Sequence, residues 1–351
     1  MSLARRRAGW LTAGTAVTAA VALTVVFVPV PFVELSPGPT FDVLGEFDGE
    51  PVISISGTPT FPTSGTLDMT TVNERGGPQQ GIYVGRAVAG WIDPDIRIVP
   101  REALFPEDVS EEQVEAENVA LFSDSQANSV AAALTYLDRP VDEVVVVSSV
   151  QGGTPADGRL EPGDEIVAVD GVEIEEPEQV TEVVQRAEPG DTVTMTVVRD
   201  GSEQSVPIVT TTSPRDPDRA YLGITVGTTY RAPFELDISL DGVGGPSAGL
   251  FFSLGIVDKL TPGQLAGGRI IAGTGTITPE GEVGAIGGIE QKMPGAREAG
   301  ATLFLAPAEN CADVLAARVP DGLTVARVAT LAEAVTTIED YVAGRPVTPC
   351  S

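Results

Sequence analysis

The first part of the chain is one long apolar run. No charged residue occurs between Arg7 and Glu34, and residues 10–32 are apolar almost throughout. As a helix this span of 23 residues covers ~34 Å, enough to cross a bilayer. Arg5, Arg6 and Arg7 precede it and favour a cytoplasmic N-terminus. We predict an uncleaved transmembrane helix within residues 1–33, with all that follows outside the cytoplasm. A signal peptide cleaved after Ala22 is the alternative.

Residues 34–140 show a mixed pattern. β-Branched runs at 52–56 and 66–72 predict strands. Ser110-Glu-Glu-Gln113 has the form of a capping box and predicts the start of a helix that reaches residue 137. No set of residues here has catalytic spacing. We therefore interpret 34–140 as a spacer region of strands and helix, packed near the membrane or against a neighbouring domain.

Residues 141–212 predict a compact unit of strands at 144–150, 192–199 and 204–210 and a helix at 178–186. Between them lies Pro162-Gly-Asp-Glu-Ile166, followed by Val169-Asp-Gly171. This combination resembles PDZ domains. The resemblance implies an extended peptide ligand that adds a strand to an exposed sheet edge. The alternative is a module that packs against its neighbours and binds nothing.

Strands and helices alternate again from residue 221. Strands are predicted at 221–227, 234–240, 270–277 and 302–306, and helices after Ser247 and at 292–299, 310–317 and 331–342. A short tail, 344–351, follows. This mixture predicts an α+β fold class for the chain as a whole.

Composition narrows the functions that this fold can have. The net charge is −29, which argues against nucleic acid as a partner. The chain has no histidine, which excludes a Ser-His-Asp triad, a Cys-His dyad and a His-ligated zinc protease. Cys311 and Cys350 are the two cysteines, and the sequence is compatible with a disulfide between them and with two separate thiols.

A glycine-rich stretch supplies a candidate nucleophile. In Asp241-Gly-Val-Gly-Gly-Pro-Ser247 a tight turn precedes an apolar run that predicts a helix. A serine hydroxyl there would lie beside backbone N–H groups that have no partner within the helix. Such N–H groups, near Gly245 and Ser247, suit an oxyanion. The alternative is a glycine turn that only caps a buried helix.

Lysine is rare in this chain. Of 21 cationic side chains, only Lys259 and Lys292 are lysines. A buried lysine can lose its proton and act as a base, whereas arginine cannot. Lys259 follows Ser247 by 12 residues on the same predicted helix, roughly 18 Å away. Lys292 is therefore the candidate base.

Three blocks in order resemble the proteolytic domain of Lon proteases: Gly245-Pro-Ser-Ala-Gly249, Thr274-Gly-Thr-Ile-Thr278 and Gly284-Ala-Ile-Gly-Gly-Ile-Glu-Gln-Lys292. The resemblance covers about residues 220–343. It implies a serine–lysine dyad of Ser247 and Lys292, with Thr274 hydrogen-bonded to the lysine. One position departs from the pattern, since Gly244 stands where Lon usually has aspartate, which puts any role of that carboxylate in doubt.

The whole chain is similar to membrane-anchored, PDZ-containing Lon-like proteases of bacteria, which lack the ATPase module. The resemblance implies an ATP-independent serine endopeptidase without a cofactor, acting on unfolded or flexible polypeptides. It also leaves a homo-oligomer open, because Lon relatives form rings. The main alternative is a membrane-tethered PDZ binding protein with an inactive protease fold; a serine–lysine signal peptidase fits the motifs less well.

Overall fold

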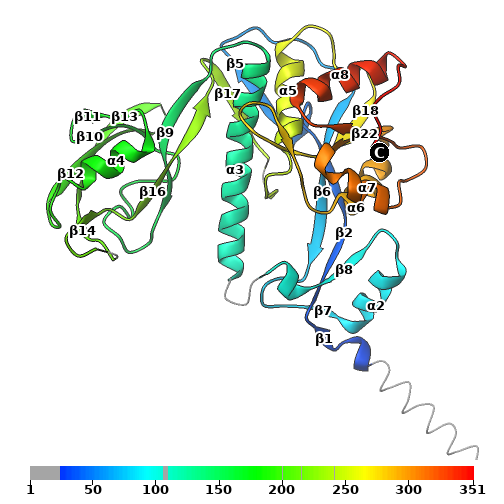
Figure 1. The fold of residues 1–351 in the computed structure, drawn as a ribbon, viewed down its shortest axis with the longest axis horizontal. Coiled ribbons are helices and arrows are strands. Elements are labelled where there is room, and N and C mark those ends of the chain that lie inside the picture. Colours follow the sequence, from blue (N-terminus) through cyan, green and yellow to red (C-terminus); the bar gives the residue numbers. More distant parts are fainter. Residues whose placement is uncertain (1–23, 106–109, 200, 215, 241) are drawn as a thin grey trace, which may run out of the picture. The chain divides into compact units, whose positions relative to one another are not determined.

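The computed structural model describes residues 24–105, 110–199, 201–214, 216–240 and 242–351. The chain forms two compact units (Figure 1). The first unit contains the residues up to Leu137 and those from Phe234 onward, and the second is Asp138–Pro233. The second unit is thus inserted, in sequence, between two parts of the first.

A mixed six-stranded sheet is the centre of the first unit. Its order is β22 (Thr324–Val328), β21 (Leu303–Pro307), β18 (Ile270–Gly273), β6 (Thr66–Arg75), β2 (Phe32–Asp42) and β8 (Arg97–Pro100). β6 runs parallel to β18 and antiparallel to β2. All five residues of β21 are buried, as is typical of a parallel strand covered on both faces.

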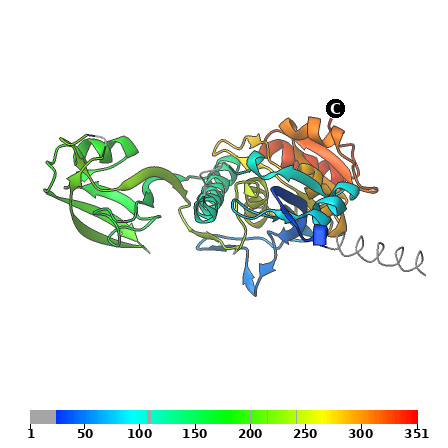
Figure 2. The same cartoon turned by 90° about the horizontal axis from the view of Figure 1, so that it is seen from below.

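Helices cover both faces of this sheet. Neighbouring residues of a strand point to opposite faces of the sheet, so Ala272 and Gly273 of β18 face different helices. Ala272 packs with α6 (Ile289–Glu298) and α7 (Cys311–Ala316), whereas Gly273 lies against Phe251 of α5 (Gly249–Leu260). α3 (Glu111–Tyr136) and α8 (Leu331–Val342) pack on α5, and Figure 2 shows α3 nearly end-on beside it. The predicted capping box is present at the start of α3.

The spacer region is not separate from the protease-like region. β2, β6 and β8 all come from residues 34–140 or just before them, yet β6 pairs directly with β18. The strand at 66–72 was predicted, but its partner was not. The two strands lie about two hundred residues apart in the sequence, and neither carries a local signal for the other. The prediction therefore missed the pairing of the strand and not the strand itself.

Most of the predicted transmembrane span, residues 10–32, lies outside the described residues. Residues 24–26 are helical, but the span does not continue as a helix to Phe32: β1 is Pro29–Val30, and β2 begins at Phe32. Pro29 and Pro31 explain this end, because proline has no N–H to donate within a helix. In the described ranges, no helix is long and apolar enough to cross a membrane.

The second unit is a sheet of five main strands with one helix. The order is β13 (Ser202–Val209), β12 (Thr192–Arg199), β10 (Glu165–Val169), β9 (Asp142–Val150) and β16 (Ile224–Arg231), and the helix is α4 (Pro177–Val184). Apolar side chains such as Val147, Ile166 and Met195 form its core. The strand expected at 221–227 belongs here, not to the protease-like region, because β16 pairs with β9 along its whole length.

Short elements complete the two units. The paired strands are β1 with β7 (Ile82–Tyr83), β3 (Glu46–Phe47) with β4 (Glu50–Pro51), β5 (Ile53–Ser56) with β17 (Glu235–Ile238), β14 (Thr211–Thr212) with β15 (Ala220–Tyr221), β19 (Thr276–Ile277) with β20 (Val283–Gly284), and β11 (Val172–Glu173) with β10. α2 is Val84–Ile92, and 3-10 turns lie at Arg101–Ala103 and Ala308–Asn310. A disulfide joins Cys311 to Cys350.

Candidate active site

Ser247 lies where the glycine turn enters α5. The helix begins two residues later, at Gly249, as the sequence predicts. Gly245 takes a positive φ of 84°, a conformation that glycine adopts without strain. The N–H of Gly245 donates to the carbonyl of Asn118 on α3 at 3.0 Å, so it is not available to an oxyanion. The N–H groups of Ser247 and Ala248 donate to no residue in the described part of the chain and remain as candidate donors.

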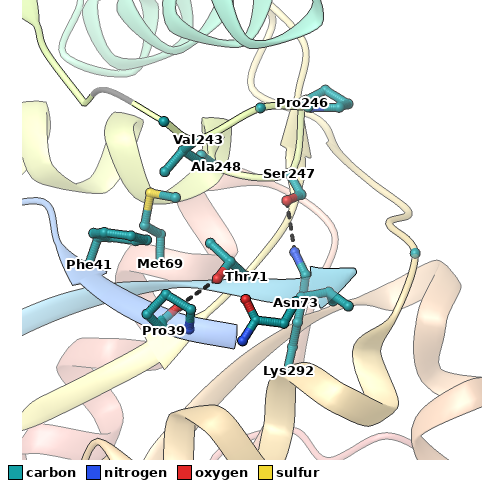
Figure 3. A pocket seen from close by; sticks show the side chains of 15 residues that line it. Pro39, Phe41, Met69, Thr71, Asn73, Val243, Pro246, Ser247, Ala248 and Lys292 are labelled. Carbon is teal, nitrogen blue, oxygen red and sulfur yellow. Dashed lines mark hydrogen bonds between the residues drawn. The ribbon is translucent and has the colours of Figure 1, made fainter. Parts of the chain in front are cut away.

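Lys292 reaches Ser247 from α6. Gly288 caps this helix in the left-handed conformation, and Lys292 is its fourth residue. The lysine Nζ lies 2.7 Å from Ser247 Oγ and 2.9 Å from Thr274 Oγ1 (Figure 3). Its side chain is nearly enclosed, with 3% of its surface exposed. The structure therefore brings together the three side chains that the sequence singles out.

Thr274 connects the two halves of this arrangement. It follows the last residue of β18 and is fully buried. Its hydroxyl accepts from Lys292 and donates to the carbonyl of Ser247 at 3.0 Å. The N–H of Gly275 donates to the same carbonyl, also at 3.0 Å. Two donors, the hydroxyl of Thr274 and the N–H of Gly275, thus hold the backbone of Ser247. The same hydroxyl of Thr274 also holds the lysine amine.

Burial changes the protonation of the lysine. Desolvation disfavours the charged form and lowers the pKa of Lys292 from 10.5 to about 7. Near neutral pH a substantial fraction of this amine is therefore neutral. Burial also lowers the pKa of Lys259, although Asp42 and Asp258 oppose that shift. Lys259 does not line the cleft that contains Ser247.

The cleft beside Ser247 has a volume of about 370 Å³ and two kinds of wall. One wall is apolar and contains Phe41, Met69, Val243 and Ala248. The other carries Thr71 and Asn73 at the end of β6, and the hydroxyl of Thr71 donates to the carbonyl of Pro39 (Figure 3). The cleft therefore presents both an apolar wall and polar groups beside the serine.

The sequence prediction missed the part of this cleft that comes from β2 and β6. Met69 and Thr71 lie in a run that reads only as a strand, and no element is predicted at Phe41, so nothing local marks the three as site residues. The one available signal is the apolar alternation of Leu67 and Met69, which places both on one face. This alternation does not indicate which face of the strand lies toward Ser247.

Known families match two parts of the chain. The PDZ domain model matches residues 123–210, and the model of the Lon protease (S16) C-terminal proteolytic domain matches residues 242–339. The PDZ match starts inside α3 and ends before β16, whereas the second structural unit is Asp138–Pro233. The chain thus carries a PDZ domain and a Lon-type proteolytic domain within a mixed α+β fold.

Two curated proteins are similar over part of their length. Lon protease of Clostridioides difficile (strain 630) is 43% identical over 70 residues, which is 20% of this chain and 9% of that protein. Lon protease 1 of Bacillus subtilis (strain 168) is 39% identical over 82 residues, which is 23% of this chain and 10% of that protein. The chain therefore matches about a tenth of the length of these relatives.

Solved structures also show local similarity. The solution structure of GtR34C from Geobacillus thermodenitrificans is 39% identical, covering 23% of this chain and 94% of that one with a TM-score of 0.22. The PDZ domain of an SdrC-like protein from Listeria innocua is 25% identical, covering 24% and 92% with a TM-score of 0.22.

Proposed function

We propose that this chain is a membrane-anchored serine endopeptidase in which Ser247 is the nucleophile and Lys292 the general base. The observation that carries the proposal is the 2.7 Å separation of Lys292 Nζ and Ser247 Oγ at a buried site. A buried amine with a pKa of about 7 is the form of lysine that can accept a proton at neutral pH.

In the acylation step, the neutral amine of Lys292 takes the hydroxyl proton as Ser247 Oγ attacks the substrate carbonyl carbon. The carbonyl oxygen becomes an oxyanion, and its candidate donors are the N–H groups of Ser247 and Ala248, which have no acceptor among the described residues. As the tetrahedral intermediate collapses, the C–N bond breaks and the lysine ammonium gives its proton to the leaving amine. The product is an acyl-enzyme ester on Ser247 with the lysine neutral again.

Deacylation repeats these steps with water. Lys292 takes a proton from the water as its oxygen attacks the ester carbonyl, and the ammonium then returns a proton to Ser247 Oγ as the acid product leaves. Thr274 does not react in either half. It is a positioning residue, because it holds the amine at 2.9 Å and the backbone of Ser247 at 3.0 Å.

We assign to the second unit the binding of polypeptide segments. β16 is an edge strand of its described sheet, and a groove with a volume of about 830 Å³ runs along it. α4 lines the groove with Val180, Thr181 and Val184, opposite Leu222 and Ile224. An edge strand beside an apolar-floored groove suits an extended peptide that adds one more strand.

The remaining parts of the proposal come from the sequence. A single N-terminal helix within residues 1–33 would anchor the chain, with the protease domain outside the cytoplasm. Hydrolysis would proceed without ATP on unfolded or flexible polypeptides and without a cofactor. A homo-oligomer is compatible with this arrangement and is not required by it.

The experiment that tests this function is labelling with a hydroxyl-reactive phosphonate probe, followed by mass spectrometry of the labelled peptide. We expect labelling at Ser247 in the full chain and none in Ser247→Ala. Labelling should also fall to background in Lys292→Arg, because the hydroxyl then has no base. A folded chain that takes no label at Ser247 would instead support the inactive binding protein.

A further inference from the structure

α2 buries its small residues and exposes its large apolar ones. Its buried residues are the small ones, Ala87 and Gly90. Its large apolar side chains face outward: Val88 is 45% exposed, Trp91 62% and Ile92 79%. These three positions share one side of the helix, because residues three and four apart lie on the same face. A surface helix that only packs on its own core has the opposite arrangement.

The orientation of α2 is fixed by close packing on the sheet side. A Cβ added to Gly90 would lie 2.5 Å from Ile98 Cδ1 on β8, so a larger residue cannot take this position unless the side chain of Ile98 shifts. The small face is therefore the one that must point inward. The exposure of Val88, Trp91 and Ile92 follows from this contact, and rotation of the helix cannot hide them.

The exposed stripe continues into the first described residues. We call the set Val25, Val26, Phe27, Val28, Tyr83, Val88, Trp91 and Ile92 the apolar patch; all eight are exposed. Phe27 makes an edge-to-face contact with Tyr83, with ring centroids 6.3 Å apart. The N–H of Val84 donates to the carbonyl of Val28 at 2.9 Å, which joins α2 to this segment. In Figure 1 α2 lies beside β1, close to where the described chain begins.

Charge is depleted over the same stretch. The chain carries 50 acidic residues, yet none occurs from Gly76 to Ile92. Arg86 is the one charged residue in that stretch. Arg86 donates to the buried Glu34 at 2.5 and 2.7 Å, so its charge is compensated. The preceding sequence, from Ala8 to Val33, has no charged residue. In a chain of net charge −29 these two stretches carry no carboxylate, and the next one along the chain is the exposed Asp93 at the end of α2.

We propose that the apolar patch lies on the surface of a lipid bilayer, with α2 parallel to the membrane and Trp91 at the level of the lipid headgroups. Continuity favours a bilayer as the occupant, because residues 25–28 of the patch belong to the uncharged apolar stretch of residues 8–33. Tryptophan and tyrosine favour the membrane–water interface, where one part of the ring is apolar and another can donate to water. A helix with a large apolar face is typical of such interfacial segments.

This inference rests on the proposed membrane anchor and adds a second contact to it. An anchor alone would leave the protease domain free to swing on its helix. With α2 on the bilayer, the first unit would be held in a set orientation close to the membrane. The site at Ser247 would then meet substrates that are themselves near the membrane surface.

The chain contains its own probe for this contact. It has two tryptophans, Trp10 and Trp91, so Trp10→Phe leaves Trp91 as the sole indole emitter. The full chain with this substitution is reconstituted into phosphatidylcholine vesicles, whose zwitterionic headgroups avoid repulsion of the acidic protein. Quenching is measured with lipids brominated either near the headgroup or at the chain end, and with acrylamide in the water.

We expect Trp91 to be quenched more strongly by bromine near the headgroup than at the chain end, and to be shielded from acrylamide at least twofold relative to the protein in detergent. Ile92→Glu in the same background should lower the lipid quenching at least twofold with unchanged thermal unfolding. Leu315→Glu, which charges an exposed apolar residue on α7, should leave it unchanged.

Three results would overturn the inference. Chain that floats with the vesicles while Trp91 stays open to acrylamide retains the anchor and refutes the interfacial helix. Shielding from acrylamide without lipid quenching would mean that a second protein surface covers the patch. Chain that does not float with vesicles at all would refute the anchor and the inference together, while the labelling of Ser247 would stand independently.

Discussion

Lys292 Nζ lies 2.7 Å from Ser247 Oγ, although the two residues are 45 positions apart, Ser247 just before α5 and Lys292 in α6. The contact exists because α5 and α6 lie on opposite faces of one sheet, and Thr274, just past β18, lies between the two side chains. A structural ion pair would need a carboxylate at this distance from the amine. The described partners of the Lys292 amine are instead two hydroxyls, which suits proton transfer.

Lys292→Arg is the most direct test of the base. Arginine keeps the positive charge but cannot give up its proton near neutral pH. We expect peptide hydrolysis to fall by a factor on the order of 10⁴ or more, as when a member of a catalytic unit is removed. The measurement is kcat/KM on a short fluorogenic peptide, with folding checked by thermal unfolding.

Lys259→Arg is the matched control, because it makes the same change at the chain's other lysine, which does not line the cleft. It should retain nearly all activity. Ser247→Ala should be as inactive as Lys292→Arg, and the double variant no worse than either, since the two groups act as one unit. A folded Lys292→Arg protein that still cleaves the peptide would contradict the dyad.

The pH dependence of hydrolysis follows from the lowered pKa of Lys292. Only the neutral amine is a base, so kcat/KM should rise tenfold per pH unit below about 7 and level off above it. The chain has no histidine to produce such a rise in its place. A rate that declines steadily from neutral to mildly alkaline pH, with the protein still folded, would argue against this base.

The same pKa shift predicts a stability effect with a defined sign. Between pH 7 and 10.5 the unfolded chain keeps the Lys292 proton and the folded chain loses it, so the free energy of unfolding rises with pH in this window. Lys292→Met removes the buried charge. It should stabilise the protein by a few kcal/mol below pH 7, with about 5 kcal/mol as the upper bound from the shift.

That gain should shrink as the pH rises above 7, because the native lysine then becomes neutral too. The measurement is urea unfolding of both proteins at several pH values from 6 to 9. Equal stability differences at all pH values would show that Lys292 is not desolvated in the folded state.

Local signals in the sequence were sufficient to single out Ser247 and Lys292, whose side chains lie in contact. A glycine turn before an apolar run placed Ser247 at a helix start, and the scarcity of lysine drew attention to Lys292. The helices at 178–186 and 331–342 were also near their observed bounds, since each carries strong apolar periodicity. The sequence does not determine the disulfide between Cys311 and Cys350, because a Cα separation cannot be read from it.

The rest of the site depended on long-range pairing. Phe41 and Met69 reach the cleft only because β6 pairs with β18, although the second unit lies between these two strands in the sequence. The strand predicted at 221–227 was placed in the wrong unit for the same reason: a β-branched strand before the glycine turn could join either unit, and pairing of β16 with β9 decides it. Gly245 was expected to help hold an oxyanion, but its N–H is taken by Asn118 of a helix that the sequence did not place nearby.

Gly288 sets the start of α6 and therefore the position of Lys292. Its φ is +71°, and an added Cβ would lie 2.6 Å from Val72 Cγ2 on β6. Gly288→Ala should lower the free energy of unfolding by about 1–3 kcal/mol through backbone strain and crowding. It should also lower kcat by moving the amine. Gly287→Ala is the control, because a Cβ there meets nothing within 4 Å, and its stability should be unchanged. Equal unfolding midpoints for the two variants would refute this account.

The groove between α4 and β16 allows binding to be separated from hydrolysis. Thr181 is exposed on α4 and lines the groove, whereas Glu182, the next residue, is exposed but does not line it. Thr181→Trp should fill the groove and block an added peptide strand without disturbing the core. Glu182→Trp makes the same change in size on the same helix and should leave the groove open.

If the second unit delivers substrates, Thr181→Trp should slow cleavage of an unfolded protein substrate at least about tenfold, as expected for the loss of a peptide-docking contact worth ~1.4 kcal/mol. Cleavage of a short peptide that reaches Ser247 without docking should stay unchanged, and Glu182→Trp should resemble the unmodified chain on both substrates. Loss of both activities in Thr181→Trp would mean that the substitution disturbs the protease domain. Retention of both would mean that this groove does not bind the substrate, and that the edge of β16 serves another ligand.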